Sequence, residues 1–134
     1  MTDSKKTEPV DNFPYLVYTD EAGRTYDGNG GGSIPIHEVT EFFYFDEYDE
    51  AHPLNDVVGE YNIIDANGDE SEFSFSYPEN PIKAKAGESV SIVIEEPESY
   101  SPDEVWIDNM SFGNGGFFIM PAFTDVRVSA SSII

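Results

Sequence analysis

The residues able to do chemistry in this sequence are its two histidines and its many carboxylates. There are 27 acidic and 6 basic residues and no cysteine. Covalent catalysis needs a nucleophile with an activating base in reach, and neither a thiol nor a Gly-x-Ser-x-Gly motif occurs. His37 and His52 are each expected in an exposed loop beside a carboxylate. With so many carboxylates, some pair of acids will always be available, so such a pair does not indicate an active site. We therefore predict a protein without catalytic residues.

Calcium binding is the chemistry that clustered carboxylates suit best, since Ca²⁺ takes several oxygen ligands. The densest run supplies four candidate ligands, Asp46, Glu47, Asp49 and Glu50. Residues 65–76 have the first three spacings of an EF-hand loop but lack its central glycine and its final glutamate. A hairpin turn explains residues 65–69 equally well. A solvated acidic surface also explains the first run, so no cofactor is predicted and Ca²⁺ is the one candidate.

Charge restricts the classes of partner. The formal net charge is −21 and the isoelectric point is about 4.1, which disfavours binding to nucleic acid or to an anionic membrane. No secretory signal is recognisable at the N-terminus, and no segment reaches transmembrane length. The hydrophobic content of 39% is too high for a disordered acidic tail. Two explanations of the acidity stay open, namely adaptation to high salt and electrostatic matching to a protein partner.

The elements that must position these residues are short strands. Apolar residues alternate with polar ones, which is the period of a half-buried strand, and Gly, Pro and Asn separate the runs. This pattern predicts an all-β fold, either an antiparallel β-sandwich or a small barrel, and we expect an antiparallel β-sandwich with Ig-like topology. Residues 101–104 resemble a helix capping box and are expected to form at most one turn. Residues 1–12 are predicted to be a flexible or partner-bound arm, and 13–134 a single β domain with possible subunits 13–81 and 82–134. The strand predictions cover 15–18, 24–26, 40–45, 57–64, 72–77, 90–94, 105–107, 117–119 and 126–130.

One predicted strand, residues 40–45, has aromatic residues on both faces. Phe42 and Tyr44 should face one side, and Phe43 and Phe45 the other. Such a strand is either central and covered on both sides, or one of its faces meets a partner. Residues 46–53 are expected to follow as an acidic loop. The candidate interface residues are Phe43, Phe45 and the terminal pair Ile133 and Ile134.

The order of motifs in residues 85–130 resembles a divergent internalin B-type repeat of bacterial surface proteins. This resemblance implies a small all-β module in a structural or adhesive setting, without catalytic residues. It also allows an alternative, a β-grasp-like unit over 82–130. The matching residues are Gly87, Val90, Ile92, Ile94, Pro97, Tyr100, Phe118, Met120, Pro121, Ala122, Asp125, Val126, Val128 and Ala130.

Three functions remain open, all of them non-enzymatic and all placed on a virion or an extracellular surface. The first is a virion accessory, such as a phage capsid decoration or tail protein, with protein partners in an assembly or a homo-oligomer. The second is a module of a bacterial cell-surface adhesin. The third is a carbohydrate-binding module, whose sugar platform would consist of Tyr15, Tyr18, Tyr44, Tyr48 and Trp106.

Overall fold

The computed structural model describes residues 17–19, 23–27, 34–113 and 115–133. All regular secondary structure among these residues is β-strand, as the alternating sequence predicts. The predicted arm at 1–12 lies outside the described residues. The strands are β1 (Val17–Thr19), β2 (Thr25–Asp27), β3 (Ile36–Phe45), β4 (Ala51–Leu54), β5 (Val57–Ile64), β6 (Glu70–Tyr77), β7 (Lys83–Lys85), β8 (Ser89–Glu96), β9 (Tyr100–Ile107), β10 (Met110–Gly113), β11 (Phe117–Ile119) and β12 (Val126–Ser132).

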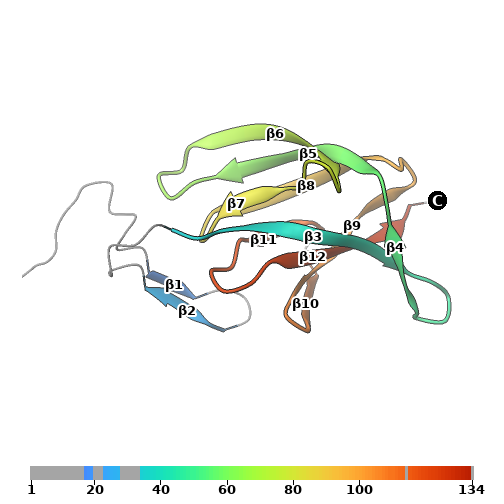
Figure 1. The fold of residues 1–134 in the computed structure, drawn as a ribbon, viewed down its shortest axis with the longest axis horizontal. Helices are drawn as coiled ribbons and strands as arrows, with labels where there is room; N and C mark the ends of the chain where they lie inside the picture. Colours follow the sequence, from blue (N-terminus) through green and yellow to red (C-terminus); the bar gives the residue numbers. More distant parts are fainter. Residues whose placement is uncertain (1–16, 20–22, 28–33, 114, 134) are drawn as a thin grey trace, which may run out of the picture.

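The strands form two sheets packed face to face, with the β1–β2 hairpin at one end (Figure 1). The larger sheet has the order β10-β9-β12-β3-β4, and β7 pairs with the beginning of β3. The smaller sheet has the order β11-β8-β5-β6. The predicted all-β sandwich is therefore confirmed. It is not purely antiparallel, because β12 runs parallel to β3, and the finer Ig-like description stays a prediction.

The core lies between the two sheets and follows the period of two. Val90, Ile92 and Ile94 of β8 are buried, while the residues between them are exposed. Phe42 of the larger sheet stacks on Phe75 of the smaller one, with ring centroids 5.6 Å apart. Further buried members from the sheets and the residues beside them include Val39, Val57, Ile82, Val105, Ile107, Phe118, Met120, Val126 and Val128.

Tyr77 of β6 links the two sheets through a polar contact. Its hydroxyl donates a hydrogen bond to the Thr40 carbonyl oxygen on β3, over 3.0 Å. Burial raises the pKa of the Tyr77 phenol, and the nearby Glu41 carboxylate raises it further. Both influences keep the phenol protonated, so it remains a donor.

Strands from both halves of the chain are neighbours in each sheet. β12 pairs with β3 in the larger sheet, and β8 pairs with β5 in the smaller one. The alternative of a separate β-grasp-like unit over 82–130 is therefore wrong, because strands of that segment pair with strands that precede it. Packing of both halves into one hydrophobic core is the physical reason.

Residues 101–104, expected to form at most one helical turn, form none, since they belong to β9. They lie opposite the end of β12, where the pairing register shifts between Val128 and Ala130. At this irregularity the buried Ser129 hydroxyl donates to the Glu104 carbonyl oxygen and accepts from the Glu104 N–H. Pro102 is tolerated in the strand because an irregular ladder does not require every N–H.

Candidate functional site

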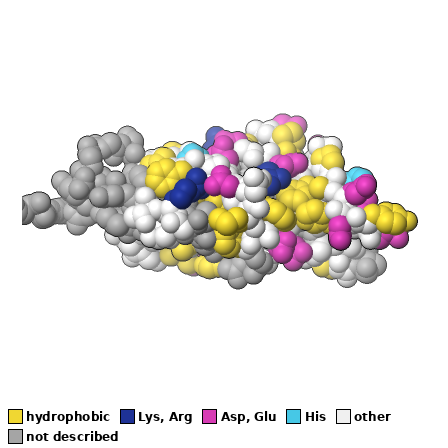
Figure 2. Space-filling view, turned by 90° about the horizontal axis from the view of Figure 1, so that it is seen from below, with side chains coloured by type: hydrophobic (Ala, Val, Ile, Leu, Met, Phe, Trp, Pro, Cys, Tyr) yellow, Lys and Arg dark blue, Asp and Glu magenta, His cyan; other side chains and the backbone are white. Residues whose placement is uncertain are grey.

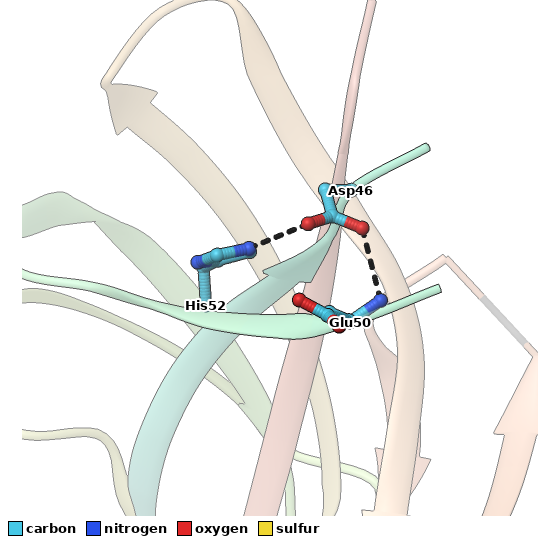
Figure 3. A group of neighbouring side chains, drawn as sticks. All are labelled: Asp46, Glu50 and His52. Carbon is cyan, nitrogen blue, oxygen red and sulfur yellow. Dashed lines mark hydrogen bonds and ion pairs between the residues drawn. The ribbon is translucent and has the colours of Figure 1, made fainter. Parts of the chain in front are cut away.

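The acidic run after β3 forms the turn of the β3–β4 hairpin. Asp46 Oδ1 accepts hydrogen bonds from the backbone N–H groups of Tyr48 and Glu50, over 2.8 and 3.0 Å. Asp46 Oδ2 lies 2.7 Å from His52 Nε2 (Figure 3). His52 belongs to strand β4, so its expected placement in a loop is corrected. The expected acidic loop of 46–53 is also shorter, because only the five residues before Ala51 form the turn. The His52 ring also stacks on Tyr44, 5.2 Å away.

These contacts decide what the calcium candidates can do. Asp46, Glu50 and His52 offer ligand atoms within 4.8 Å of one another, and Glu47 and Asp49 are not part of this group. However, both oxygens of Asp46 already accept hydrogen bonds. The Glu50 N–H, and then the His52 side chain, lower the pKa of the Asp46 carboxyl group. The cluster is therefore explained by hydrogen bonds within the turn, which engage the Asp46 carboxylate. A metal ion would have to compete with His52 for that carboxylate.

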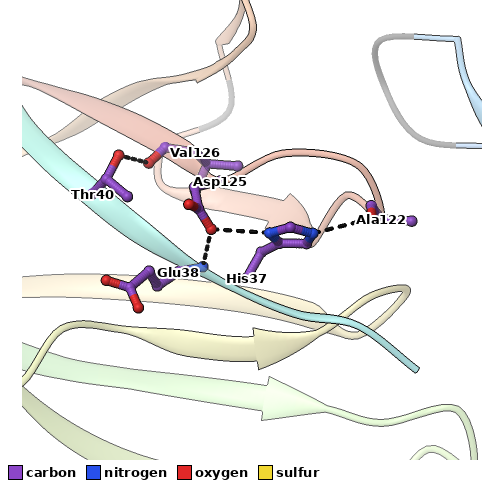
Figure 4. A network of polar contacts seen from close by, with 6 residues as sticks. All are labelled: His37, Glu38, Thr40, Ala122, Asp125 and Val126. Carbon is purple, nitrogen blue, oxygen red and sulfur yellow. Dashed lines mark hydrogen bonds and ion pairs between the residues drawn. The ribbon is translucent and has the colours of Figure 1, made fainter. Parts of the chain in front are cut away.

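The second histidine forms a comparable pair with Asp125. His37 Nδ1 lies 3.0 Å from Asp125 Oδ1, and His37 Nε2 lies 3.0 Å from the Ala122 carbonyl oxygen (Figure 4). His37 is in β3, so its placement in a loop is corrected. Carbonyl and carboxylate oxygens only accept hydrogen bonds, so each contact is made through an N–H of the ring where that nitrogen carries a proton.

The same Asp125 oxygen also accepts the backbone N–H of Glu38, over 3.0 Å. A second hydrogen bond connects the two strands two residues further along β3, where the Thr40 hydroxyl donates to the Val126 carbonyl oxygen. The His37–Asp125 pair thus belongs to a network that anchors the start of β12 along the parallel strand β3 (Figure 4). Its role in the structure is positional.

The outer surface of the larger sheet carries the most distinctive group of side chains. Phe43 and Phe45 of β3 each have a ring centroid 6.0 Å from that of Trp106 on β9. The Arg127 guanidinium of β12, which lies between these strands, sits 5.4 Å from the Phe43 centroid and 5.7 Å from the Trp106 centroid. We call Phe43, Phe45, Trp106 and Arg127 the aromatic face.

The aromatic face is held in place by its neighbours. Arg127 lies 3.7 Å from the Glu41 carboxylate and donates to the Asp108 carbonyl oxygen over 3.4 Å. These contacts fix the guanidinium over the rings. Trp106 Nε1 is buried and has no hydrogen-bond partner within the described part of the chain.

Burial divides the predicted interface residues. Phe43 is only 3% exposed, because Phe45, Trp106 and Arg127 cover it, whereas Phe45 is 42% exposed. The prediction that β3 is covered on both sides therefore holds at Phe42 and Phe43, which are buried on opposite faces. It does not hold at Phe45, which is exposed to solvent. Ile133 is 64% exposed at the far end of β12, and Ile134 lies outside the described residues.

Figure 2 shows this outer surface of the larger sheet. Hydrophobic side chains gather in several groups, some of which lie beside basic side chains, with acidic side chains among them. Besides the aromatic face, Arg24 lies over the exposed Phe123 ring at 5.4 Å and forms an ion pair with Asp108.

Of the residues expected to form a sugar platform, the three whose side chains are described are not brought together. Tyr44 points to the opposite side of β3 from Phe43 and contacts His52 and Tyr100. Tyr48 is exposed at the β3–β4 turn, while Trp106 belongs to the aromatic face. Tyr15 and the side chain of Tyr18 lie outside the described residues. Sequence reasoning missed Arg127, because its position opposite Trp106 depends on the pairing of β12 with β9.

Comparisons with protein-family models, curated proteins and solved structures gave no match for this chain. The resemblance of residues 85–130 to an internalin B-type repeat therefore stays a prediction. The described residues contain no helix that is long and apolar enough to cross a membrane.

Proposed function

We propose that this protein is a non-enzymatic structural protein that binds a protein partner through the aromatic face. The kind of protein that fits best is a virion accessory, such as a phage capsid decoration or tail protein. The observation that carries the proposal is a fixed aromatic cluster on an outer sheet surface, with Phe45 42% exposed. Aromatic residues and Arg dominate the energetics of protein interfaces.

The aromatic face has the properties of a preorganised contact. Its rings and guanidinium are already fixed by mutual packing, so binding costs little side-chain entropy. The negative charge of the whole chain, −21, favours a partner surface that is neutral or basic and disfavours another copy of the same chain.

The test compares two exposed phenylalanines on opposite sheets. Phe45→Ser changes the aromatic face, and Phe117→Ser changes β11 of the smaller sheet at nearly the same exposure, 43%. Each purified protein is mixed with virus particles isolated from the source organism and sedimented. We expect the wild type and Phe117→Ser to co-sediment equally, and Phe45→Ser to bind about tenfold more weakly.

Other outcomes would overturn the proposal. Antibody labelling of the cell envelope, without labelling of virus particles, would favour the adhesin module. Binding on a glycan array that Phe45→Ser abolishes would favour the carbohydrate-binding module. Equal loss of sedimentation in both variants would show that the aromatic face has no special part in binding.

A further inference from the structure

The outer edge of β6 is a second surface of interest, because part of its backbone forms no hydrogen bond with the described part of the chain. β6 is the last strand of the smaller sheet and lies along the top of the sandwich in Figure 1. Near its end, the Ser76 N–H donates to the Asn80 carbonyl oxygen, and the Asn80 N–H donates to the Ser76 carbonyl oxygen. The bonding groups of Ser76 therefore point away from β5.

The ladder repeats every two residues, which identifies the other groups on this edge. The backbone groups of Glu72 and Glu70 point in the same direction as those of Ser76. Between them, the Ser74 carbonyl oxygen lies 3.5 Å from Asn80 Nδ2. The chain therefore covers the edge at Ser76 and touches it at Ser74, while Glu70 and Glu72 present both a donor and an acceptor outward.

An apolar groove of about 300 Å³ opens between β6 and β7. Ile36, Ile63, Phe73 and Ala84 form its apolar lining, and charged side chains of both signs, three acidic and two basic, together with Ser71 complete it. Phe73 is 45% exposed and stacks on Tyr61 with ring centroids 5.4 Å apart. The core-facing side of β6 thus continues into an open hydrophobic surface beside the free edge.

Unlike the edge of β6, the edge of β7 across this groove is covered by side chains of the chain itself. Its pairing with β3 uses one side. On the other side the Lys85 N–H donates to Glu88 Oε1 over 2.8 Å, and the Lys83 N–H lies 3.5 Å from the Tyr61 hydroxyl oxygen. Side chains of the chain itself therefore occupy the edge of β7, which leaves β6 as the edge suited to accept another strand.

We propose that the edge of β6 at Glu70–Ser74 binds an extended segment of a partner protein as an added strand. The segment should alternate apolar with basic residues. Its apolar side chains would enter the groove beside Phe73, and its basic side chains would lie on the outer side, near the Glu70 and Glu72 carboxylates. This proposal is independent of the aromatic face.

Charge argues against another copy of the chain as the occupant. Glu70, Glu72 and Glu60 lie on the outer side of the smaller sheet, on neighbouring strands. A second β6 edge would place the same glutamates opposite them, and like charges directly across a ladder are destabilising. A basic segment relieves this repulsion, so the partner is a different protein.

The test uses a defined probe, the acetylated and amidated peptide Lys-Val-Lys-Val-Lys-Val-Lys with a fluorescent label. We expect binding by anisotropy, with new hydrogen-exchange protection at the Glu70 and Glu72 amides. Glu72→Pro removes one outward N–H and is compatible with an edge strand. It should weaken binding about tenfold. Glu72→Gln keeps that N–H and should weaken binding less.

A second measurement changes the peptide instead of the protein, which keeps the test decisive if Glu72→Pro does not fold. Methylation of alternate amide nitrogens removes the hydrogen-bond donors along one edge of the same peptide. The methylated peptide should not bind with that edge facing β6. A peptide with Glu in place of Lys should bind at least about tenfold more weakly. Equal binding of all peptides, protection at another edge, or protection of the β6 amides by self-association would overturn the proposal.

Discussion

The two sheets contain one hairpin turn each with the same hydrogen bonds. In the β3–β4 turn, the Asp46 N–H donates to the Glu50 carbonyl oxygen, and the Asp49 N–H donates to the Asp46 carbonyl oxygen. In the β5–β6 turn, Asp65, Gly68 and Asp69 repeat this arrangement. In both turns the first aspartate Oδ1 accepts the N–H groups two and four residues later.

The difference between the turns lies in the fourth residue and in one side chain from the following strand. Asp49 takes φ +62° where the second turn has Gly68 at φ +85°. Asp46 is also bonded to His52, and no such histidine follows Asp65. One backbone design is therefore reached with and without glycine, and only the Asn67-Gly68 version was recognisable as a tight hairpin.

This comparison changes the interpretation of the acidity. The sequence suggested solubility and partner matching, and several aspartates also have defined structural roles. Asp46 and Asp65 organise turns, and Asp125 holds His37 and the Glu38 N–H. Asp49, Asp56 and Asp108 adopt positive φ, which Asp tolerates better than most residues. Part of the negative charge is thus required by the backbone.

The largest effect should come from removing the first aspartate of each turn. Asp65→Ala removes two accepted hydrogen bonds and should lower the free energy of unfolding by about 1–2 kcal/mol. Asp46→Ala should lower it more, because His52 loses its partner as well. Urea unfolding measures both, and Asp65→Asn is the control because it keeps the acceptor. The reverse order would mean that the His52 contact adds nothing.

A smaller effect should come from exchanging the fourth residues. Asp49→Gly relieves the left-handed conformation and should stabilise the protein by about 0.5–1 kcal/mol, after the added entropy of the unfolded chain is subtracted. Gly68→Asp should destabilise it by a similar amount. Thermal unfolding of both variants measures this, and an unchanged melting temperature for Asp49→Gly would contradict the role of φ.

Acid should distinguish the first turn further. The lowered pKa of Asp46 means that its ionised form stabilises the fold above the ordinary Asp pKa. That contribution is lost as the pH falls through the lowered value. The stability advantage of the wild type over Asp46→Asn should therefore shrink below about pH 4. Glu47→Gln removes a charge from the same turn and serves as the control, and an advantage independent of pH would oppose this explanation.

Calcium should have the smallest effect. Because both Asp46 oxygens are engaged, we expect millimolar CaCl₂ to leave the melting temperature unchanged. A site with a Kd a hundredfold below the added concentration would stabilise the fold by about 2.7 kcal/mol. Differential scanning fluorimetry detects such a change easily. A rise in melting temperature that Asp46→Asn abolishes would show that the turn binds the ion.

Much of the fold was predictable because its signals are local. The alternation in residues 57–64 and 90–94 identified β5 and the centre of β8, and Asn67-Gly68 identified the hairpin between β5 and β6. By contrast, β4 was taken for a loop because Pro53 and the preceding acids obscured it. Its pairing with β3 is what makes it a strand. For residues 101–104 the sequence only limited a helix to one turn, and the pairing with β12 is what makes them part of a strand.

The candidate site was only half predictable. Phe43 and Phe45 follow from the aromatic run in β3. Trp106 was noticed but assigned to a sugar platform, and Arg127 was not considered. Their meeting depends on the order β9-β12-β3 and on the register that sets Arg127 opposite both Trp106 and Glu41. No local pattern encodes that register.

The amino-acid sequence alone determined that this chain builds strands, which side chains of several strands turn inward, and that the surface is strongly acidic. These properties depend on residue type and on neighbours one or two positions away. The tertiary structure decided which strands lie side by side, that β12 runs parallel to β3, and that Arg127 covers two aromatic rings. Those features require segments distant in the sequence to pack around one core, so the free energy of the whole fold selects them.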